Sequence, residues 1–275
     1  INSGNPVKSC VEQYDGTAWS VQNPRSFGIC LNAGAGSVNA AFAAGGGYPY
    51  KDCNEEWNGL TFVQAAVLPV GVGTTGGLGT EAAGIVAGGS ANSGIVGCAQ
   101  EYTKDFIPPY TTCVWTKGAS LISGRYSGAG GGVTNAGLVF GGVIAPNRVS
   151  CTEEYDGTVY TAGGAMITAR NNLAGGGTQN AGIAAGGEPS NDGRTEEYNG
   201  STWSTGGSMS NGGYGMNGNG TQDKFIVQSK QPATVKSEKY NGSSWSATND
   251  MNIARTAHLF IGDSDSGIIL GGSPF

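Results

Sequence analysis

Four arginines recur at one place in a repeating pattern, and the chemistry they suit is the recognition of anions. Arg125, Arg170 and Arg255 each lie ten residues after an aromatic residue, and Arg25 lies six residues after Trp19. A guanidinium group is well shaped for bidentate binding of carboxylate, sulfate or phosphate. One interpretation is a ring of arginines that binds an anion such as an acidic glycan. The other is that each arginine ties neighbouring repeats together, through carbonyl groups or the repeat's own glutamates.

Adjacent pairs of acidic residues also recur, and two carboxylates are what most glycosidases use. Neighbouring residues on a β-strand point to opposite faces, so the two members of such a pair cannot act on one bond. Their recurrence with the repeat favours a structural role. The pairs are Glu55-Glu56, Glu153-Glu154 and Glu196-Glu197.

Histidine chemistry is restricted, because His258 is the only histidine in the chain. A copper centre with two histidine ligands is therefore excluded, and no G-x-S-x-G segment accompanies His258 to suggest a catalytic triad. We expect His258 to be packed or hydrogen-bonded on the innermost strand of the last repeat. The expectation is a protein that is not an enzyme and uses no metal or cofactor.

A repeat of aromatic residues defines the elements that must position these side chains. A first aromatic recurs at intervals of 43, 45, 53, 43 and 42 residues, and in five copies a second follows five residues later. Asp-Gly or Asn-Gly lies between the two in those copies, which predicts a type I′ turn in a tight hairpin with an aromatic on each arm. The first aromatics are Tyr14, Trp57, Tyr102, Tyr155, Tyr198 and Tyr240; the second are Trp19, Phe62, Tyr160, Trp203 and Trp245, with Trp115 in the remaining copy.

Glycine pairs such as Gly141-Gly142 and Gly186-Gly187 end a short apolar run in each repeat except the fifth, where Gln228-Ser229 stands instead. A period of about 43 residues with four short strands is the mark of a β-propeller. A glycine pair followed by a tyrosine and a tryptophan at fixed offsets resembles the kelch repeat, over nearly the whole chain. We expect an all-β fold, a six-bladed β-propeller of kelch-like repeats that forms a single domain over residues 1–275.

The two ends of the chain are expected to share one blade. Residues 7–14 and 17–21 have the pattern of third and fourth strands, whereas residues 256–272 have that of first and second strands. Pairing the N-terminal strands with the C-terminal strands would close the ring and leave no long open sheet edge. Because the chain begins at Ile1 without a methionine, we expect a processed product or a piece of a longer protein.

The repeats differ most between the glycine pair and the next aromatic. In repeat proteins such variation gathers in loops on one face, often the face that binds. An insertion at residues 104–110 lies between third and fourth strands, so it is expected on the opposite face, as a long hairpin or a contact to another protein. Beside the four arginines, the candidate ligand-binding residues of the variable loops are Tyr48, Tyr50, Asn147, Arg148, Asn191 and Asp192.

Composition narrows the range of partners. Charged residues make up 12% of the chain and the net charge is −6. With no run of Lys or Arg, the sequence argues against binding to nucleic acid or to an anionic membrane. No apolar stretch is long enough to span a bilayer, so no membrane insertion is expected. The sequence does not exclude an oligomer.

The cysteines follow the repeat as well. Four of the six lie four residues before a first aromatic, at Cys10, Cys53, Cys98 and Cys151. Equivalent sites in adjacent blades should be too far apart for a disulfide, which needs Cα atoms within about 7 Å. We expect reduced, small apolar side chains and folding in a reducing cytoplasm. Cys98 and Cys113 are close enough in sequence to leave one disulfide open.

The repeat segment TEEYNGSTWS at residues 195–204, in a chain rich in Asn, Ser, Thr and Gly, resembles propeller domains of phage virion appendages such as tail fibres. The resemblance implies a non-enzymatic recognition or structural module, an adhesin at the virion surface or outside the cell. It would bind a host-surface glycan or another virion protein. The alternative is a hydrolase or lyase that acts on acidic sugars with an arginine-lined axial mouth.

Overall fold

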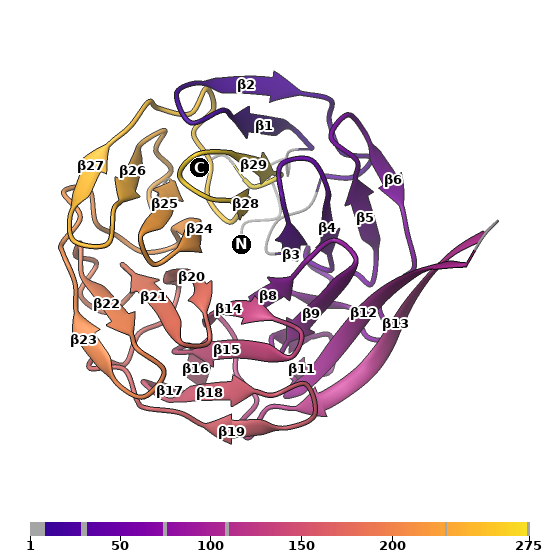
Figure 1. Cartoon of the computed structure of the whole chain (residues 1–275), viewed down its shortest axis with the longest axis horizontal. Coiled ribbons are helices and arrows are strands. Elements are labelled where there is room, and N and C mark those ends of the chain that lie inside the picture. The colour runs from indigo at the N-terminus through magenta and orange to yellow at the C-terminus, as the bar shows by residue number, and fades with distance from the viewer. Residues whose placement is uncertain (1–8, 29–31, 74–75, 108–109, 229, 274–275) are drawn as a thin grey trace.

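One unit of four short antiparallel strands recurs along the chain, with its first strand near a common axis and its fourth strand at the rim (Figure 1). The computed structural model describes residues 9–28, 32–73, 76–107, 110–228 and 230–273. Within these ranges there are six four-stranded sheets, one three-stranded sheet and one two-stranded sheet. The same ranges hold no helix, and hence none long and apolar enough to cross a membrane. The protein is all-β and propeller-like, as the repeat predicts.

The six larger sheets each run from the axis outward, and in chain order their strands are as follows. The first sheet contains β3 (Ala33–Gly36), β4 (Ala41–Ala44), β5 (Asn54–Trp57) and β6 (Phe62–Gln64), and the second contains β8 (Gly76–Gly79), β9 (Ala83–Ala87), β12 (Cys98–Ile107) and β13 (Tyr110–Ser120). The third contains β14 (Ala129–Val133), β15 (Ala136–Phe140), β18 (Thr152–Tyr155) and β19 (Tyr160–Ala162), and the fourth contains β20 (Ala174–Thr178), β21 (Ala181–Ala185), β22 (Thr195–Tyr198) and β23 (Trp203–Thr205). The fifth contains β24 (Asn217–Thr221), β25 (Lys224–Gln228), β26 (Ser237–Tyr240) and β27 (Trp245–Ala247), and the sixth contains β28 (Leu259–Gly262), β29 (Gly267–Leu270), β1 (Val11–Tyr14) and β2 (Trp19–Gln22).

Two small sheets lie in the connections. One pairs β10 (Ser90–Ala91) and β11 (Gly94–Ile95), from a connection between second and third strands, with β7 (Val72–Gly73), which precedes the first strand β8. The other contains β16 (Val143–Ile144) and β17 (Asn147–Arg148), both from a connection between second and third strands.

One sheet combines strands from the two ends of the described chain. β1 pairs with β29 in an antiparallel register that places Val11 opposite Leu270 and Tyr14 opposite Gly267. The first strand of this sheet, β28, contacts β24 on one side and β3 on the other. The described N-terminal and C-terminal strands therefore share one sheet, and residues 1–8 and 274–275 lie outside the described residues.

The hydrophobic core is divided among the spaces between neighbouring sheets. In one of these spaces, Leu138 and Phe140 of β15 pack against Tyr198 and Trp203 of the next sheet. The ring centroids of Phe140 and Trp203 lie 4.9 Å apart in an edge-on arrangement, which aromatic pairs favour. Because each sheet buries its apolar face only against its neighbours, the repeats depend on one another for their cores.

Glycine is required where the first and second strands crowd together near the axis. A Cβ atom on Gly84 would lie 2.2 Å from Cε1 of Phe42, and one on Gly175 would lie 2.6 Å from Cζ of Phe140. A larger residue at either position would displace an aromatic ring of the core. The high glycine content of the sequence is thus explained by close packing rather than by low complexity.

The hairpin between third and fourth strands differs from the predicted turn. Tyr14 lies directly opposite Trp19, so four residues, not two, form the loop. Oδ1 of Asp15 accepts hydrogen bonds from the backbone N–H groups of Thr17 (2.9 Å) and Ala18 (2.7 Å). Of the two residues Asp15 and Gly16, only Gly16 has a positive φ, at +92°. The type I′ prediction is wrong, since a type I′ turn needs positive φ at both central residues.

The inserted segment is a long hairpin, as predicted. β12 and β13 pair from Cys98 opposite Ser120 to Ile107 opposite Tyr110, with one irregularity after Cys98. Figure 1 shows the end of this hairpin projecting beyond the rim of the ring. It belongs to a third-to-fourth-strand connection, so it extends from the edge opposite to the variable loops.

Candidate functional site

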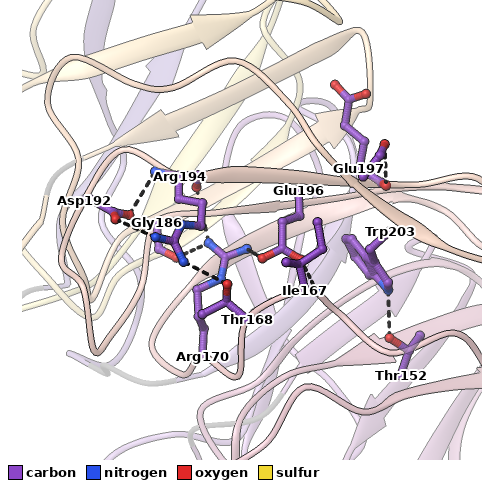
Figure 2. Close-up of polar contacts among 11 residues, drawn as sticks. Thr152, Ile167, Thr168, Arg170, Gly186, Asp192, Arg194, Glu196, Glu197 and Trp203 are labelled. Carbon is purple, nitrogen blue, oxygen red and sulfur yellow. Dashed lines mark hydrogen bonds and ion pairs between the residues drawn. The ribbon is translucent and has the colours of Figure 1, made fainter.

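Arg170 lies in the connection that leads into the sheet of β20–β23, and its guanidinium is enclosed by protein (Figure 2). Nη2 donates a hydrogen bond to Oε1 of Glu196 at 3.0 Å, and Nη1 donates to the carbonyl oxygens of Gly186 at 2.7 Å and Arg194 at 3.2 Å. Burial lowers the pKa of Arg170, and the carboxylate of Glu196 opposes that shift. The side chain anchors the incoming connection to the second and third strands of its sheet.

The other three arginines of the pattern are also buried against glutamates of the framework. Each is at most 3% exposed, and each has a buried glutamate of the third strand as its ion-pair partner. The pairs are Arg25–Glu55, Arg125–Glu153 and Arg255–Glu12. None of the four arginines lines the axial cavities described below. The expectation of an arginine-lined anion-binding mouth must be corrected, because the donors that would meet a ligand already bind carboxylates and carbonyls of the framework.

Two repeats have no arginine at the equivalent position. In these repeats the third-strand residue that would pair with the arginine binds backbone groups instead. Gln100 replaces the glutamate in one of them, and its amide donates to the carbonyl of Val70 at 3.0 Å and accepts from the Val70 N–H at 2.8 Å. In the other, Glu238 accepts from the backbone N–H groups of Ser210 and Asn211, each at 3.1 Å. In both repeats the third-strand side chain binds backbone groups of the incoming connection in place of an arginine, which favours a structural role for the network.

The second acid of each pair points to the opposite side of its strand, as predicted, and accepts a hydrogen bond from the first aromatic of the next repeat. The Tyr198 hydroxyl donates to Oε1 of Glu154 at 2.5 Å, and the Tyr240 hydroxyl donates to Oε1 of Glu197 at 2.5 Å. Burial, followed by the hydrogen bond to Glu197, raises the pKa of Tyr240 to about 12. The paired acids thus link each sheet to its neighbours.

The variable loops carry the remaining candidate residues on one face of the molecule. Tyr48 is 80% exposed, and its ring lies edge-on to that of Tyr50 with centroids 5.7 Å apart. The backbone N–H of Tyr50 donates to Oδ1 of Asn92 in the next loop at 3.1 Å. This pair of tyrosines presents aromatic surface from a loop that its neighbour holds in place.

A second group of candidates lies around Arg148, which follows Asn147 in β17. Nε of Arg148 donates to Oδ1 of Asn171 and Nη2 donates to Oε2 of Glu188, both at 2.6 Å. The Arg148 side chain is 43% exposed, so part of the guanidinium still faces solvent. The contacts connect one variable loop with the next repeat.

The third group lies in the loop of Asn191 and Asp192. Asn191 is left-handed with φ of +52°, and the carboxylate of Asp192 pairs with Arg194 at 3.2 Å. Arg194 in turn donates to the hydroxyl of Thr168 at 2.8 Å. The three groups therefore occupy separate loops of one face.

Two cavities lie on the axis, and their lining differs from the predicted arginine-lined mouth. The first, of about 360 Å³, runs between the innermost strands and reaches the turns between first and second strands, including Ser37 and Asp263. The second, of about 210 Å³, lies at the face of the variable loops and is called the axial mouth below. Its polar lining includes Asn32, Asn172, Tyr214, Gln231 and His258.

His258 is packed, which is one of the two alternatives expected from the sequence. The side chain is 2% exposed, and neither ring nitrogen has a hydrogen-bond partner among the described residues. The residues of the axial mouth come from several repeats and, apart from Asn217 of β24, from connections. The only sequence signal for them is their place two or three residues after the repeated arginine position, as for Asn172 and His258.

The cysteines of the described part of the chain are free thiols: Cys10, Cys53, Cys98, Cys113 and Cys151. The register places Cys98 opposite Ser120 and Cys113 opposite Lys104, so the disulfide left open between Cys98 and Cys113 does not form. Burial raises the pKa of Cys53. Cys30 lies outside the described residues. Among the described residues, no group of three or more His, Cys, Asp or Glu side chains could hold a metal ion.

The geometry defines an all-β, propeller-like protein with a ring of structural ion pairs, one face of variable loops and an axial mouth. No family model matches the chain, and no curated protein matches it. Among solved structures, the chain is similar in fold to the structure of YjhT, with a TM-score of 0.73 and 11% sequence identity. The match covers 91% of this chain and 92% of that chain. At this level of identity the similarity concerns the fold alone.

Proposed function

We propose that the chain is a six-bladed β-propeller of kelch-like repeats whose ring is closed by the strands of its two ends. The six four-stranded sheets, with first strands that contact one another around the axis, support this description. The antiparallel pairing of β1 with β29 supports the closure. On this architecture, the connections between second and third strands share one face.

The proposed function is recognition without catalysis, in an appendage of a phage virion that binds a host-surface glycan or another virion protein. The observation that carries the proposal is the division of roles between the residues. The charged side chains that recur with the repeat are buried in framework contacts, as with Arg170 and Glu196. The side chains that differ between repeats, such as Tyr48 and Arg148, are the ones exposed on the loop face. Such variation on a regular scaffold is typical of binding surfaces.

The alternative, a hydrolase or lyase for acidic sugars, depends on the four arginines. Their guanidinium groups already bind Glu12, Glu55, Glu153 and Glu196 of the framework. No observation on the described residues favours this alternative over binding.

A glycan array and a binding assay on host cells test the proposal with purified, folded protein. We expect the wild type to bind, and Tyr48→Ala or Arg148→Ala to weaken binding about tenfold or more, as exposed Tyr and Arg side chains often do at interfaces. Leu60→Ala is the matched control, because Leu60 is 72% exposed in a third-to-fourth-strand turn on the other face.

The choice between the two partner classes follows from a capture experiment with the proteins of the purified virion. Binding to a virion protein, weakened by the same two loop variants, would support docking in place of glycan recognition. A folded protein that binds no glycan, no cell and no virion protein would contradict the proposed function.

A further inference from the structure

The axial mouth contains buried polar groups that have no hydrogen-bond partner among the residues that the structure describes. Asn32 is 6% exposed and His258 is 2% exposed, and both residues line the cavity. The amide oxygen and nitrogen of Asn32, and both ring nitrogens of His258, have no hydrogen-bond partner among the described residues. An unsatisfied buried polar group costs about 1–3 kcal/mol, so two such side chains beside one cavity require an explanation.

No charged side chain of the described residues lines the axial mouth. The cavity is lined by Asn, Gln, Ser, Tyr and His side chains with glycine and apolar residues, and by no Asp, Glu, Lys or Arg among the described residues. Burial, together with the positive charge of Arg255, lowers the pKa of His258 to about 3, so the ring is neutral at physiological pH. A charged ligand would lose its hydration here without gaining a counter-ion, which disfavours it strongly.

Polar and apolar side chains both line the cavity. Leu173 and Met216 supply apolar walls, and Tyr214 supplies an aromatic ring. Polar side chains outnumber apolar ones in this lining, so the cavity is more polar than a typical small-molecule site and suits a ligand rich in hydroxyl groups. A volume of about 210 Å³ is small for a drug-sized ligand but suits one compact ring that carries hydroxyl groups.

The rim of the axial mouth is built from backbone in an unfavourable conformation. Ser127, Asn172 and Ala257 are left-handed, with φ of 55°, 53° and 53°, and all three line the cavity. The N–H of Asn172 donates to the carbonyl of Ser127 at 2.9 Å, and the N–H of Gly215 donates to the carbonyl of Asn172 at 2.9 Å. Each of the three lies two residues after a repeated arginine, so this uncommon conformation recurs with the repeat and shapes the rim.

We propose that the axial mouth binds one uncharged saccharide unit, whose hydroxyl groups pair with the side chains of Asn32 and His258. This inference rests on the proposed recognition function and deepens it, because the cavity opens on the face of the variable loops, where Gln231 reaches its wall. Asn32 supplies amide donors and an acceptor, and neutral His258 supplies one of each. A sugar hydroxyl is both donor and acceptor and can satisfy either.

Isothermal titration calorimetry on the wild type tests the inference with defined probes. The neutral probes are glucose, galactose, mannose and N-acetylglucosamine, and the charged probes of similar size are glucuronate and glucosamine. We expect at least one neutral probe to bind with a Kd of about 1 mM or tighter, and both charged probes to bind at least tenfold more weakly. Saturation by no neutral probe at about 10 mM, or tighter binding of glucuronate, would overturn the inference.

Variants connect the binding to the two side chains. Asn32→Leu and His258→Phe should each weaken the neutral probe about tenfold or more. Neither should lower the melting temperature, because each removes an unpartnered buried polar group. The control is Tyr160→Phe, which removes another buried hydroxyl without a partner among the described residues, away from the cavity, and should leave binding unchanged. Unchanged binding in both mouth variants would refute the site.

The glycan array separates failure of this inference from failure of the proposed function. If the wild type and both mouth variants bind the same array glycans equally, recognition stands and the axial mouth is not the site. If the wild type binds no array glycan, cell or virion protein, the recognition function fails whatever the calorimetry gives.

Discussion

The guanidinium of Arg255 donates a hydrogen bond to the carboxylate of Glu12, a residue 243 positions earlier in the chain. Both side chains are fully buried, and Arg255 also donates to the carbonyls of Gly271 and Cys10. The same kind of pair elsewhere joins residues at most 30 positions apart, as in Arg25–Glu55. One repeated interaction thus serves as a local tie in three repeats and as the link between the chain's two ends in a fourth.

Arg255→Met should destabilise the protein by about 3–5 kcal/mol, because removal of one partner leaves a buried, uncompensated carboxylate on Glu12. Urea unfolding followed by tryptophan fluorescence measures the loss. The control is Arg148→Met, since Arg148–Glu188 is a part-exposed pair and such pairs contribute about 0–1 kcal/mol. A loss in Arg255→Met no greater than in the control would contradict the closing role of this pair.

Gln100→Glu should destabilise the protein in a pH-dependent manner. The new carboxylate cannot donate to the Val70 carbonyl, and it has no arginine partner in this repeat. Burial would raise its pKa above the unfolded value, so the folded state would retain the proton over a window in which the unfolded chain loses it. Stability should therefore fall as the pH rises from about 4 to 7, by about 1–3 kcal/mol relative to wild type. If the difference in stability between Gln100→Glu and the wild type is the same at about pH 4 and pH 7, this account is wrong.

Tyr198→Phe should cost about 1.5–3 kcal/mol, the range for a hydrogen bond to a charged group, because Glu154 loses a buried donor. Thermal and urea unfolding would report the change. Tyr48→Phe provides the comparison, since Tyr48 is 80% exposed and loses no buried contact. Equal stability of the two variants would show that the links between neighbouring sheets contribute little.

His258 should make the protein less stable in mild acid. Its folded pKa of about 3 lies below its ordinary value of 6.5, so between these values the unfolded chain binds a proton that the folded chain excludes. The stability contributed by the neutral ring is complete above pH 6.5 and is lost as the pH falls toward 3. From pH 7 to pH 5 this amounts to about 2 kcal/mol. Urea unfolding of wild type and His258→Phe at both pH values isolates the effect, and identical pH dependence would argue against a neutral, buried His258.

Much of the fold could be predicted from the sequence because the repeat is local and periodic. The spacing of Tyr14 and Trp19 and the acid pairs indicate strand positions and facing directions that the structure retains. The predicted turn type is wrong because Asp-Gly suggests two loop residues, whereas opposed aromatics five positions apart require four. The spacing of the two aromatics is visible in the sequence and is a better guide to the length of the loop than the Asp-Gly pair.

The candidate site was harder to predict, for two physical reasons. An arginine binds a ligand's carboxylate and the protein's own glutamate by the same geometry, so only burial separates the two roles for Arg170. The axial mouth combines Asn32, Ser127, Tyr214 and His258 from different repeats, and their place after the repeated arginine position does not show that they meet at one cavity. The exposed loop residues Tyr48 and Arg148 stay predictions until binding is measured.

The central claim is recognition without turnover. The most direct test is a saturation-transfer NMR experiment on the wild type with a glycan selected by the array, recorded at once and again after a day. We predict saturation transfer to the sugar protons and an unchanged glycan spectrum at both times. New signals from a cleaved, eliminated or isomerised sugar, absent without protein, would contradict the account and identify an enzyme.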